Sequence, residues 1–325
     1  MKIKNCELIM TVKEMEDRDA WLKIRTSGIG GSDAGTIMGS NPWKSPYQLW
    51  LEKTGQVEAE DISNKGPVYW GTKLEPLIAR KFAEETGKKV ERLGMLRHIS
   101  DPWMLANVDR AVMHEDAGLE IKTTNAFRAS DWDGDNLPDS YYWQCQHYMM
   151  CTGQPLWYIA VLIGGQDFRW KEVPRCQEDI DELYKRERAF WTINVQQHIM
   201  PEIDGSQMTK DALIERYPGG GTDVVDLPKE MDLLLAMRSR LTEDIDDRKA
   251  RLQQVNNKIM AMMEDNEVGM TPAGARVTWK PQAGRTTIDS KKLAKDWPDA
   301  YEACKKVGKP IRVLRIKEAD DNGND

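Results

Sequence analysis

The sequence predicts a mixed α/β fold in which helices flank a central sheet of parallel and antiparallel strands, with a smaller unit after it. Within residues 15–200, segments with helical and with extended patterns alternate. After residue 228 the pattern changes to one long amphipathic helix. The chain has 325 residues and 40% hydrophobic content, which is enough for one substantial core and a smaller second one.

Helix signals dominate the beginning of the first region. Short helices are predicted around residues 20–24 and 46–53. A longer amphipathic segment carries Glu75 and ends at Gly87, a residue type that readily adopts the left-handed conformation at a helix end. Three successive strands are predicted from about residue 89 to residue 124.

Two of these strands carry acidic residues. Residues 104–112 are predicted to form one strand with Asp109, and residues 118–123 the next strand with Glu120. The polar stretch from residue 114 to residue 118 indicates a hairpin turn between them. Closing this hairpin brings Asp109 beside Glu120.

The second of these strands also carries a cation. In an extended strand residues two apart point to the same face, so Glu120 and Lys122 share one side while Leu119 and Ile121 turn to the core. Carboxylates that can hold metal ions and a nearby cation are what hydrolysis of a phosphodiester requires. Taken alone this pattern is weak, because most charges on strand faces are only solvated.

A helix predicted over residues 141–149 adds polar groups. Gln144 and Tyr148 are four residues apart and lie on one helical face. They are candidates for a site, but the same helix could be placing them at the rim of an aromatic core. His147, a single histidine with no nucleophile to pair with, is expected to be structural.

The rest of the first region completes the sheet and one more helix. Strands are predicted near residues 156–163 and 168–173, and a long helix from about residue 178 to residue 198. Residues 201–228, which are rich in Pro and Gly, are predicted to be a linker. The first domain therefore covers residues 1–200.

The second unit, residues 229–317, is predicted to begin with a helix over about residues 228–263. Apolar residues recur along it with 3-4 spacing, interrupted by Arg248; they are Leu234, Met237, Leu241, Ile245, Leu252, Val255, Ile259 and Met262. This seam must pack within the chain or between subunits, or else serve as a docking surface for another protein.

The end of the chain is expected to hold small elements. A strand at residues 275–280, a helix capped by Asp289 and a strand at residues 311–316 are predicted. The acidic tail, residues 318–325, is predicted to be disordered.

Charge and cysteine content exclude several classes of protein. A net charge of −7 argues against a general nucleic-acid coat protein, so cationic contacts to DNA must be local. Residues 271–317 are basic, with twelve Lys or Arg against four Asp or Glu, whereas residues 202–267 have nine against fifteen. Five scattered cysteines without a Cys-x-x-Cys pair fit a reducing cytoplasm and argue against an iron–sulfur cluster. No secretory start is present and no apolar run approaches the roughly 20 residues that span a bilayer, so no membrane association is expected.

A further block lies near the start of the chain. Arg25 ends an amphipathic segment, and a glycine-rich turn from residue 28 leads through Ser32 into a second helix. A guanidinium can grip a terminal phosphate with two hydrogen bonds, and the start of a helix offers N–H groups to an anion. Alternatively, Ser32 is only an N-cap and Arg25 a surface ion pair. The glycine spacing does not match a dinucleotide-binding fingerprint.

The order of a helix-borne Glu, an Asp strand, a Glu-x-Lys strand and a Gln-x-x-x-Tyr helix resembles the PD-(D/E)XK nuclease superfamily, in its branch with the RecB-type Gln-x-x-x-Tyr motif. Within it the chain is similar to the YqaJ family of phage recombination nucleases, which is related to phage lambda exonuclease. The block from Arg25 to Ser32 is similar to the segment by which lambda-type exonucleases hold a 5′-phosphate. The resemblance covers roughly residues 15–200. It implies the restriction-endonuclease-like core of this superfamily.

The resemblance also implies roles for residues. Asp109 and Glu120 are hard oxygen ligands suited to Mg²⁺ or Mn²⁺, and the resemblance adds the backbone carbonyl of Ile121 and a second ion per site. Glu75 is placed beside the metals or the attacking water. Lys122 would orient or deprotonate that water and stabilise the transition state; the alternative is a simple salt bridge to a neighbouring carboxylate.

Gln144 is expected to orient the DNA or the metal-bound water, and Tyr148 is a weaker candidate for the same task. The implied function is a 5′→3′ exodeoxyribonuclease acting on linear double-stranded DNA in phage-type homologous recombination, within the cytoplasm of a bacterial host. The implied product is a 3′ single-stranded overhang for a single-strand annealing protein, and the implied assembly is a homo-oligomer, namely a trimeric ring. The alternatives are an endodeoxyribonuclease of the same superfamily and a non-catalytic DNA-binding recombination adaptor.

Overall fold

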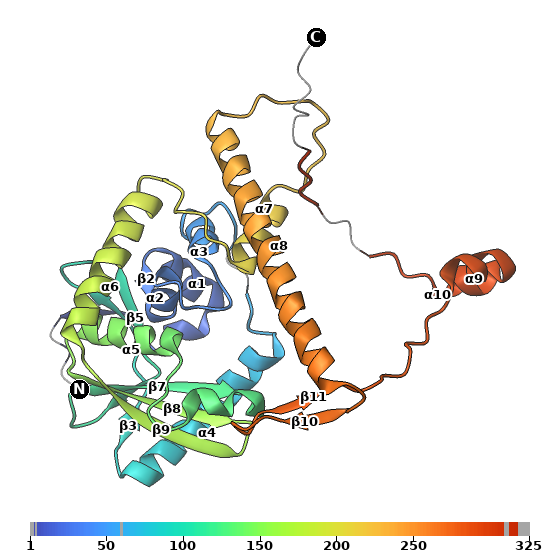
Figure 1. Cartoon of the computed structure of the whole chain (residues 1–325). Coiled ribbons are helices and arrows are strands. Elements are labelled where there is room, and N and C mark those ends of the chain that lie inside the picture. Colours follow the sequence, from blue (N-terminus) through green and yellow to red (C-terminus); the bar gives the residue numbers. More distant parts are fainter. Residues whose placement is uncertain (1–2, 4, 59–60, 309–311, 318–325) are drawn as a thin grey trace. The chain divides into compact units, whose positions relative to one another are not determined.

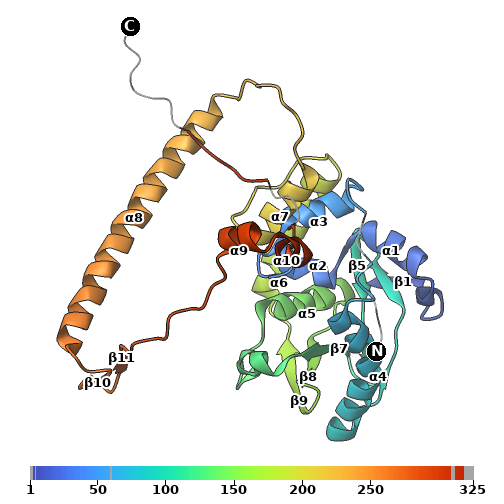
Figure 2. The ribbon, with the colours of Figure 1, turned by 90° about the vertical axis from the view of Figure 1, so that its right-hand side faces the viewer.

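A computed structural model describes residue 3 and residues 5–58, 61–308 and 312–317. The chain forms two compact units, residues 1–218 and residues 219–325, and each is treated by itself below. Figures 1 and 2 show the elements of both units. None of the helices within the described ranges is both long enough and apolar enough to cross a membrane.

The N-terminal part of the first unit contains a small sheet of four strands in the order β1-β4-β5-β2. These strands are β1 (Cys6–Met10), β2 (Ile29–Gly30), β4 (Met95–His98) and β5 (Met104–Asn107). Strand β2 runs parallel to β5, so the glycine-rich turn is anchored next to the segment that leads to Asp109. Three helices lie in the same part of the chain, namely α1 (Arg18–Thr26), α2 (Gly31–Ile37) and α3 (Pro46–Lys53).

A second sheet of five strands carries most of the expected site. Its order is β3-β6-β7-β8-β9, with β7 and β8 parallel and the other pairs antiparallel. The strands are β3 (Val90–Glu91), β6 (Arg110–Val112), β7 (Ala117–Thr124), β8 (Leu156–Ile163) and β9 (Asp167–Pro174). The predicted mixed sheet is therefore confirmed, as is the hairpin that joins β6 to β7.

Helices cover both faces of this sheet (Figure 1). On one face Ile78 and Phe82 of α4 (Gly66–Thr86) pack with Leu119 and Ile121 of β7. On the other face, α5 (Asp139–Thr152) packs on the apolar side chains of β8 that point the opposite way. The alternation along β7 thus follows the predicted pattern, and it turns Glu120 and Lys122 toward α5.

One predicted strand is wrong. Residues 104–112 do not form a single strand but break at Val108–Asp109 into β5 and β6, which belong to different sheets. At the break, side chains replace the ladder: the Tyr148 hydroxyl donates to the Asn107 carbonyl, and the Arg110 guanidinium donates to the Asp109 carbonyl. Asp109 therefore lies at the junction between the two sheets.

The predicted linker also begins too early. Helix α6 (Gln177–Ala189) continues as a π-helical turn (Phe190–Val195), and residues 207–216 form another helix, α7 (Gln207–Arg216). Ala212 of α7 packs in the same cluster as Leu49 and Trp50 of α3. These apolar contacts keep the segment in the first unit, which extends to Pro218.

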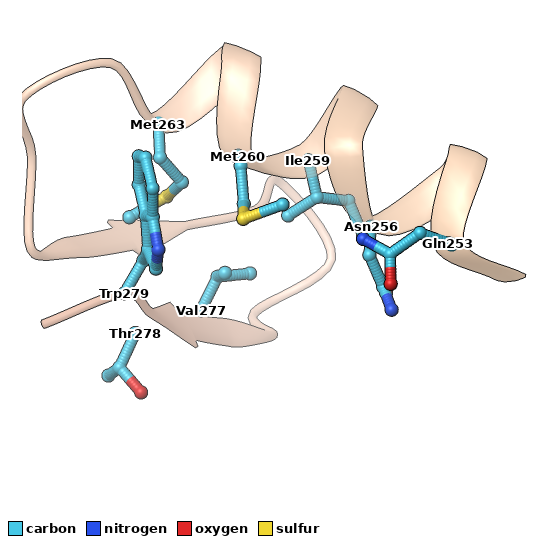
Figure 3. A pocket seen from close by; sticks show the side chains of 8 residues that line it. All are labelled: Gln253, Asn256, Ile259, Met260, Met263, Val277, Thr278 and Trp279. Carbon is cyan, nitrogen blue, oxygen red and sulfur yellow. The ribbon is translucent and has the colours of Figure 1, made fainter.

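The second unit is built on one long helix, α8 (Glu230–Met263), as predicted. It is followed by a hairpin of β10 (Val268–Met270) and β11 (Arg276–Thr278), of which only the second strand was expected. Figure 3 shows the shallow pocket between this hairpin and the end of α8, where Met260, Met263, Val277 and Trp279 meet.

Two short helices, α9 (Ser290–Asp296) and α10 (Pro298–Cys304), come next, and the Asp289 side chain caps the first as predicted. The strand predicted at residues 311–316 is not found in the part that the structure describes: residues 312–317 are neither helix nor strand, and none of the described sheets includes them. Residue 311 and the predicted disordered tail, residues 318–325, lie outside the described residues.

Candidate active site

The two acidic residues of the hairpin come together as the sequence predicts. The Asp109 carboxylate accepts a hydrogen bond of 2.7 Å from the backbone N–H of Ile121. This bond forms where β6 no longer pairs with β7, since the ladder between them ends at Arg110 and Leu119. Asp109 thus occupies the position that the next residue of a longer β6 would have taken.

Glu120 and Lys122 lie on the same face of β7 and contact each other. The Lys122 ammonium is 2.5 Å from Glu120 Oε1, and it also donates to Gln144 Oε1 at 3.0 Å. Gln144 closes the ring by donating to Glu120 Oε1 at 2.7 Å. Both readings of Lys122, a cation in the site and a salt bridge to the neighbouring carboxylate, therefore describe the same contact.

Tyr148 stabilises this set of three hydrogen bonds through Gln144. Its hydroxyl accepts from Gln144 at 3.0 Å and donates to the Asn107 carbonyl at 2.8 Å. Gln144 and Tyr148 are both buried, and their hydrogen bonds fix the positions of Glu120 and Lys122.

Glu75 reaches the site from α4, but it is held by a residue that the sequence did not indicate. The buried guanidinium of Arg110 lies 2.5 Å from Glu75 Oε1 and also donates to the backbone carbonyl of Asp109. The ion pair spans 35 residues of sequence, and no local pattern signals it. Arg110 thereby links the helix-borne acid to the strand-borne acid.

The carboxylates repel one another through a poorly solvated region. Burial raises the pKa of Asp109 well above its ordinary value, and the charges of Glu120 and Glu75 raise it further. Burial also raises the pKa of Glu120, although Lys122 opposes the change. Both groups therefore hold protons more tightly than exposed carboxylates do, unless another cation joins them.

Lys122 stays charged. Burial alone would lower the pKa of Lys122, but the carboxylate of Glu120, together with Tyr141 and Asp109, outweighs burial and holds it above its ordinary value. Its ammonium also lies 4.7 Å from the centre of the Tyr141 ring. Lys122 thus brings a positive charge next to the two carboxylates.

The donor set fits a hard divalent cation. Glu120 Oε2 is buried without a hydrogen-bond partner, which is costly for a carboxylate oxygen and would be relieved by a cation. The N–H and C=O of one strand residue point to the same side, so the bond from the Ile121 N–H to Asp109 directs the Ile121 carbonyl toward the acids as well.

Within the described ranges, no three Asp, Glu, His or Cys side chains gather closely enough to hold an ion by themselves. The reason is visible at Glu75, which faces Arg110 instead of Asp109 and Glu120. The ion ligands of this chain would therefore be Asp109, Glu120 and the Ile121 carbonyl, with Glu75 joining only if it left Arg110.

The predicted phosphate-binding pair also meets. The Arg25 guanidinium donates to the Ser32 hydroxyl at 2.5 Å and lies over the Trp21 ring. The prediction that Ser32 is only an N-cap is wrong, because Gly30 is the N-cap of α2. The side chain of Arg25 remains 36% exposed, so it can still reach an anion.

The backbone of the glycine-rich turn is less open than expected. The Gly30 N–H donates to the carboxylate of Asp33, and the Ile29 N–H donates to the Trp103 carbonyl. The buried ammonium of Lys53 lies 2.8 Å from Asp33 and donates to the carbonyls of Arg25 and Gly28. These bonds fix the turn, so an anion here would be held by side chains.

Asp33 and Lys53 were not singled out from the sequence, although they set the charge beside Arg25 and Ser32. Burial alone would raise the pKa of Asp33, but Lys53 and Arg25 outweigh it and hold the pKa well below its ordinary value. Two cations thus surround one carboxylate, which leaves a net positive charge beside Ser32.

His147 has the structural role that was expected, but it is fully buried and paired. Its Nδ1 is 2.8 Å from Glu187 of α6, and its Nε2 is 2.9 Å from the Leu105 carbonyl. Burial alone would lower the pKa of His147, but Glu187 outweighs it and raises the pKa. The pair ties α5 to α6 and to β5.

The fold and the site define a class. A mixed sheet with one acid directly before a strand, a second acid and a lysine on the neighbouring strand, a further acid on a preceding helix and a Gln-x-x-x-Tyr helix on the same face is the arrangement that the sequence resemblance to PD-(D/E)XK nucleases implies. The chain belongs to the YqaJ family.

Membership rests on comparison with known proteins. Residues 20–155 match the model of the YqaJ-like viral recombinase domain. The uncharacterized protein YqaJ of Bacillus subtilis is 39% identical over 98% of this chain and 99% of its own length. Protein D345L of African swine fever virus is 39% identical over only 57 residues, which is 18% of this chain and 16% of its own.

Solved structures offer weaker likenesses. The alkaline exonuclease LHK-Exo from Laribacter hongkongensis has 19% identity and a TM-score of 0.46, covering 53% of this chain and 90% of its own. A phage-related exonuclease from Haemophilus somnus has 11% identity and a TM-score of 0.39, covering 58% of this chain and 96% of its own.

Proposed function

We propose that this protein is a divalent-metal-dependent nuclease that hydrolyses phosphodiester bonds in DNA. The observation that carries the proposal is the convergence of Asp109, Glu120 and Lys122 around a buried carboxylate oxygen without a partner. A site of this kind needs a cation to offset its carboxylates, and Mg²⁺ or Mn²⁺ is the cation that oxygen donors select. Membership in a family described as viral recombinases supports DNA as the substrate.

Bound ions, two per site in the proposal, would supply positive charge to the scissile phosphate and lower the pKa of a bound water. The residues of this chain do the rest. Asp109 and Glu120 would hold the ion, and Gln144 donates a hydrogen bond that keeps Glu120 in place. Lys122, which stays protonated, faces the charge that develops on the phosphate. Glu75, released from Arg110, would orient the attacking water.

We further propose that cleavage starts from 5′ ends of linear double-stranded DNA, runs 5′→3′ and leaves 3′ overhangs. Arg25 and Ser32 form a compact pair with net positive charge nearby, which suits a terminal phosphate. Such a product would serve a single-strand annealing protein in recombination, in the cytoplasm of a bacterial host. A trimeric ring is the assembly that the resemblance implies.

Two variants test catalysis and recognition of DNA ends separately. Lys122→Ala should reduce cleavage of linear duplex DNA by about 10²–10³-fold in Mg²⁺, because a charge that stabilises the transition state is lost. Lys88→Ala, which removes a lysine paired with Glu115, is the matched control and should cleave normally. Equal activity of Lys122→Ala and wild type would leave a non-catalytic DNA-binding adaptor as the better account.

End recognition is read on the same duplexes with and without a 5′-phosphate. Arg25→Gln should remove the preference for the phosphorylated end while cleavage itself persists. Arg18→Gln is the control, since Arg18 also lies over the Trp21 ring, 4.1 Å from its centre. Cutting of closed circular DNA by the wild type would instead identify an endonuclease of the same superfamily.

A further inference from the structure

Helix α8 carries an apolar seam that the second unit leaves largely uncovered. The exposed fractions of Leu234, Leu241 and Leu252 are 58%, 58% and 60%. The end of the helix, where Met263 is buried, lies against the β10–β11 hairpin (Figure 3). A helix of this length with an open apolar seam requires a partner.

The seam has the period of a two-stranded coiled coil. Positions a and d of a heptad alternate without a break along the helix; they are Met231, Leu234, Arg238, Leu241, Ile245, Arg248, Leu252, Val255, Ile259 and Met262. Eight of the ten are apolar, and the two exceptions are arginines. This period suits packing against another helix rather than against a flat surface.

The charges of α8 are divided at its middle. Residues 230–247 hold six Asp or Glu and two Lys or Arg, whereas residues 248–263 hold four Lys or Arg and no Asp or Glu. The change of sign falls between Asp247 and Arg248, near the middle of the helix that runs from Glu230 to Met263. The helix thus has an acidic part and a basic part of similar length.

We propose that α8 pairs with α8 of a second copy of this chain, in antiparallel orientation about a two-fold axis near residues 246 and 247. This orientation sets each acidic half against a basic half, whereas a parallel pair would set like charges together. It also keeps the arginines apart, because Arg248 then faces Ile245 and Arg238 faces Val255. Leu241 faces Leu252, and Leu234 faces Ile259.

A parallel pair in register would place Arg238 on Arg238 and Arg248 on Arg248 in the buried seam. Two uncompensated guanidinium pairs in a coiled-coil interior are unfavourable. The antiparallel pair instead lets each arginine lay its aliphatic stem along an apolar partner and keep its charge at the rim. At the flanks, Asp244 of one copy approaches Arg251 of the other.

Each α8 pair links two subunits, so the assembly contains an even number of subunits. If the first units also form a ring of three, the pairs join two rings. The proposal concerns the second unit and does not depend on the nuclease chemistry, because its readout is the mass of the particle.

Charge reversal tests the pairing by light scattering of the full chain. One variant carries Glu230→Lys, Asp244→Lys and Asp247→Lys, and another carries Lys249→Glu, Arg251→Glu and Lys258→Glu. Each should have half the mass of the wild-type particle, because its two halves repel those of its copy. An equimolar mixture should recover the wild-type mass, since the altered halves now attract.

A control separates the seam from net charge. Lys291→Glu, Lys292→Glu and Lys295→Glu in α9 change the net charge as much as the second variant and should leave the mass unchanged. Unaltered mass of both α8 variants, or an odd number of chains in the wild-type particle, would overturn the proposal.

Orientation is tested by cross-linking in a Cys304→Ser background. Leu241→Cys and Leu252→Cys should each fail to form an oxidised dimer alone, and should form one when the two variants are mixed. Efficient cross-linking of either variant to itself would show a parallel pair and overturn the antiparallel arrangement.

Discussion

The buried carboxyl group of Asp109 makes the stability of the metal-free protein depend on pH. Burial and the neighbouring carboxylates raise its pKa, so between the unfolded value of about 3.9 and the folded value the native chain binds more protons than the unfolded chain. The free energy of unfolding of the metal-free protein must therefore fall as the pH rises through this interval. A cation that binds the ionised form reverses the effect.

We therefore predict that the stabilisation by Mg²⁺ grows with pH. The ion competes with the proton on Asp109, so its affinity increases as that carboxyl ionises. At a hundredfold excess over Kd the gain is about 2.7 kcal/mol. Melting temperatures in Mg²⁺ and in chelator, from about pH 5 to about pH 8, measure it.

Asp109→Asn provides the control for this titration. The amide is neutral and nearly the same size, so the Mg²⁺-dependent rise in melting temperature should vanish at every pH. A rise that persists in this variant, or one that shrinks as the pH increases in the wild type, contradicts the assignment of Asp109 as the titrating ligand.

The site residues that the sequence predicts are those brought together by the spacing within one strand or one helix. The two-residue period of a strand placed Glu120 and Lys122 together, and the four-residue spacing of a helix did the same for Gln144 and Tyr148. Arg110 was not predicted, because its ion pair with Glu75 spans 35 residues and depends on how α4 lies across the sheet.

The ion pair between Lys53 and Asp33 was not predicted for the same reason. They lie on different helices, and no periodicity relates them. Their neighbours Arg25 and Ser32 were predicted from a guanidinium beside a helix start and from resemblance to a known segment, and not from the charges that surround them. Buried ion pairs between distant elements are thus the class of contact that the sequence does not reveal.

At the scale of the elements, the close approach of α2 and α5 connects the two parts of the site. A Cβ on Gly31 would lie 2.6 Å from the Tyr148 ring, and one on Gly35 would lie 2.9 Å from the Ser140 backbone. These glycines allow α2, which carries Ser32, to rest on the helix that carries Gln144. The distance from Arg25 and Ser32 to the acids is set by this contact.

We predict that Gly31→Ala lowers both stability and cleavage. The added methyl must displace Tyr148 or all of α2, at a cost of about 1–3 kcal/mol for an overpacked contact. Displacing Tyr148 loosens Gln144 and with it Glu120. Thermal unfolding and cleavage of 5′-phosphorylated duplex measure the two effects.

Gly66→Ala is the matched change. Gly66 begins α4 and has nothing within 4 Å of an added Cβ, so stability should stay the same or rise slightly. If Gly31→Ala melts at the wild-type temperature, α2 does not rest on α5 as described.

Element boundaries mark the limit of pattern reasoning. Residues 104–112 have a continuous strand-like composition, yet side chains of Tyr148 and Arg110 take the backbone carbonyls at the break. Residues 312–317 have a strand-like composition, yet they are neither helix nor strand. Local composition indicates that a segment can be extended, and only the rest of the fold decides whether it pairs.

At the scale of the whole molecule, the candidate active site and the proposed pairing surface lie in different units. The candidate site, with all its supporting contacts, lies before Pro218, and the α8 seam lies after it. The net charge of −7 belongs to the whole chain, but the acidic and basic halves of α8 show that charge is organised locally. Chemistry and self-association should therefore be separable.

A chain ending at Pro218 should fold, cleave DNA in Mg²⁺ and lose the pairing through α8. Its apolar clusters, including the one that holds α7 against α3, are complete within residues 1–218, so the melting temperature of this unit should match that in the full chain. Light scattering should give half as many subunits per particle as the full chain. If the truncated protein keeps the subunit number of the full chain, self-association resides in the first unit. If it unfolds, the second unit is part of the nuclease core and the two tasks are not separable.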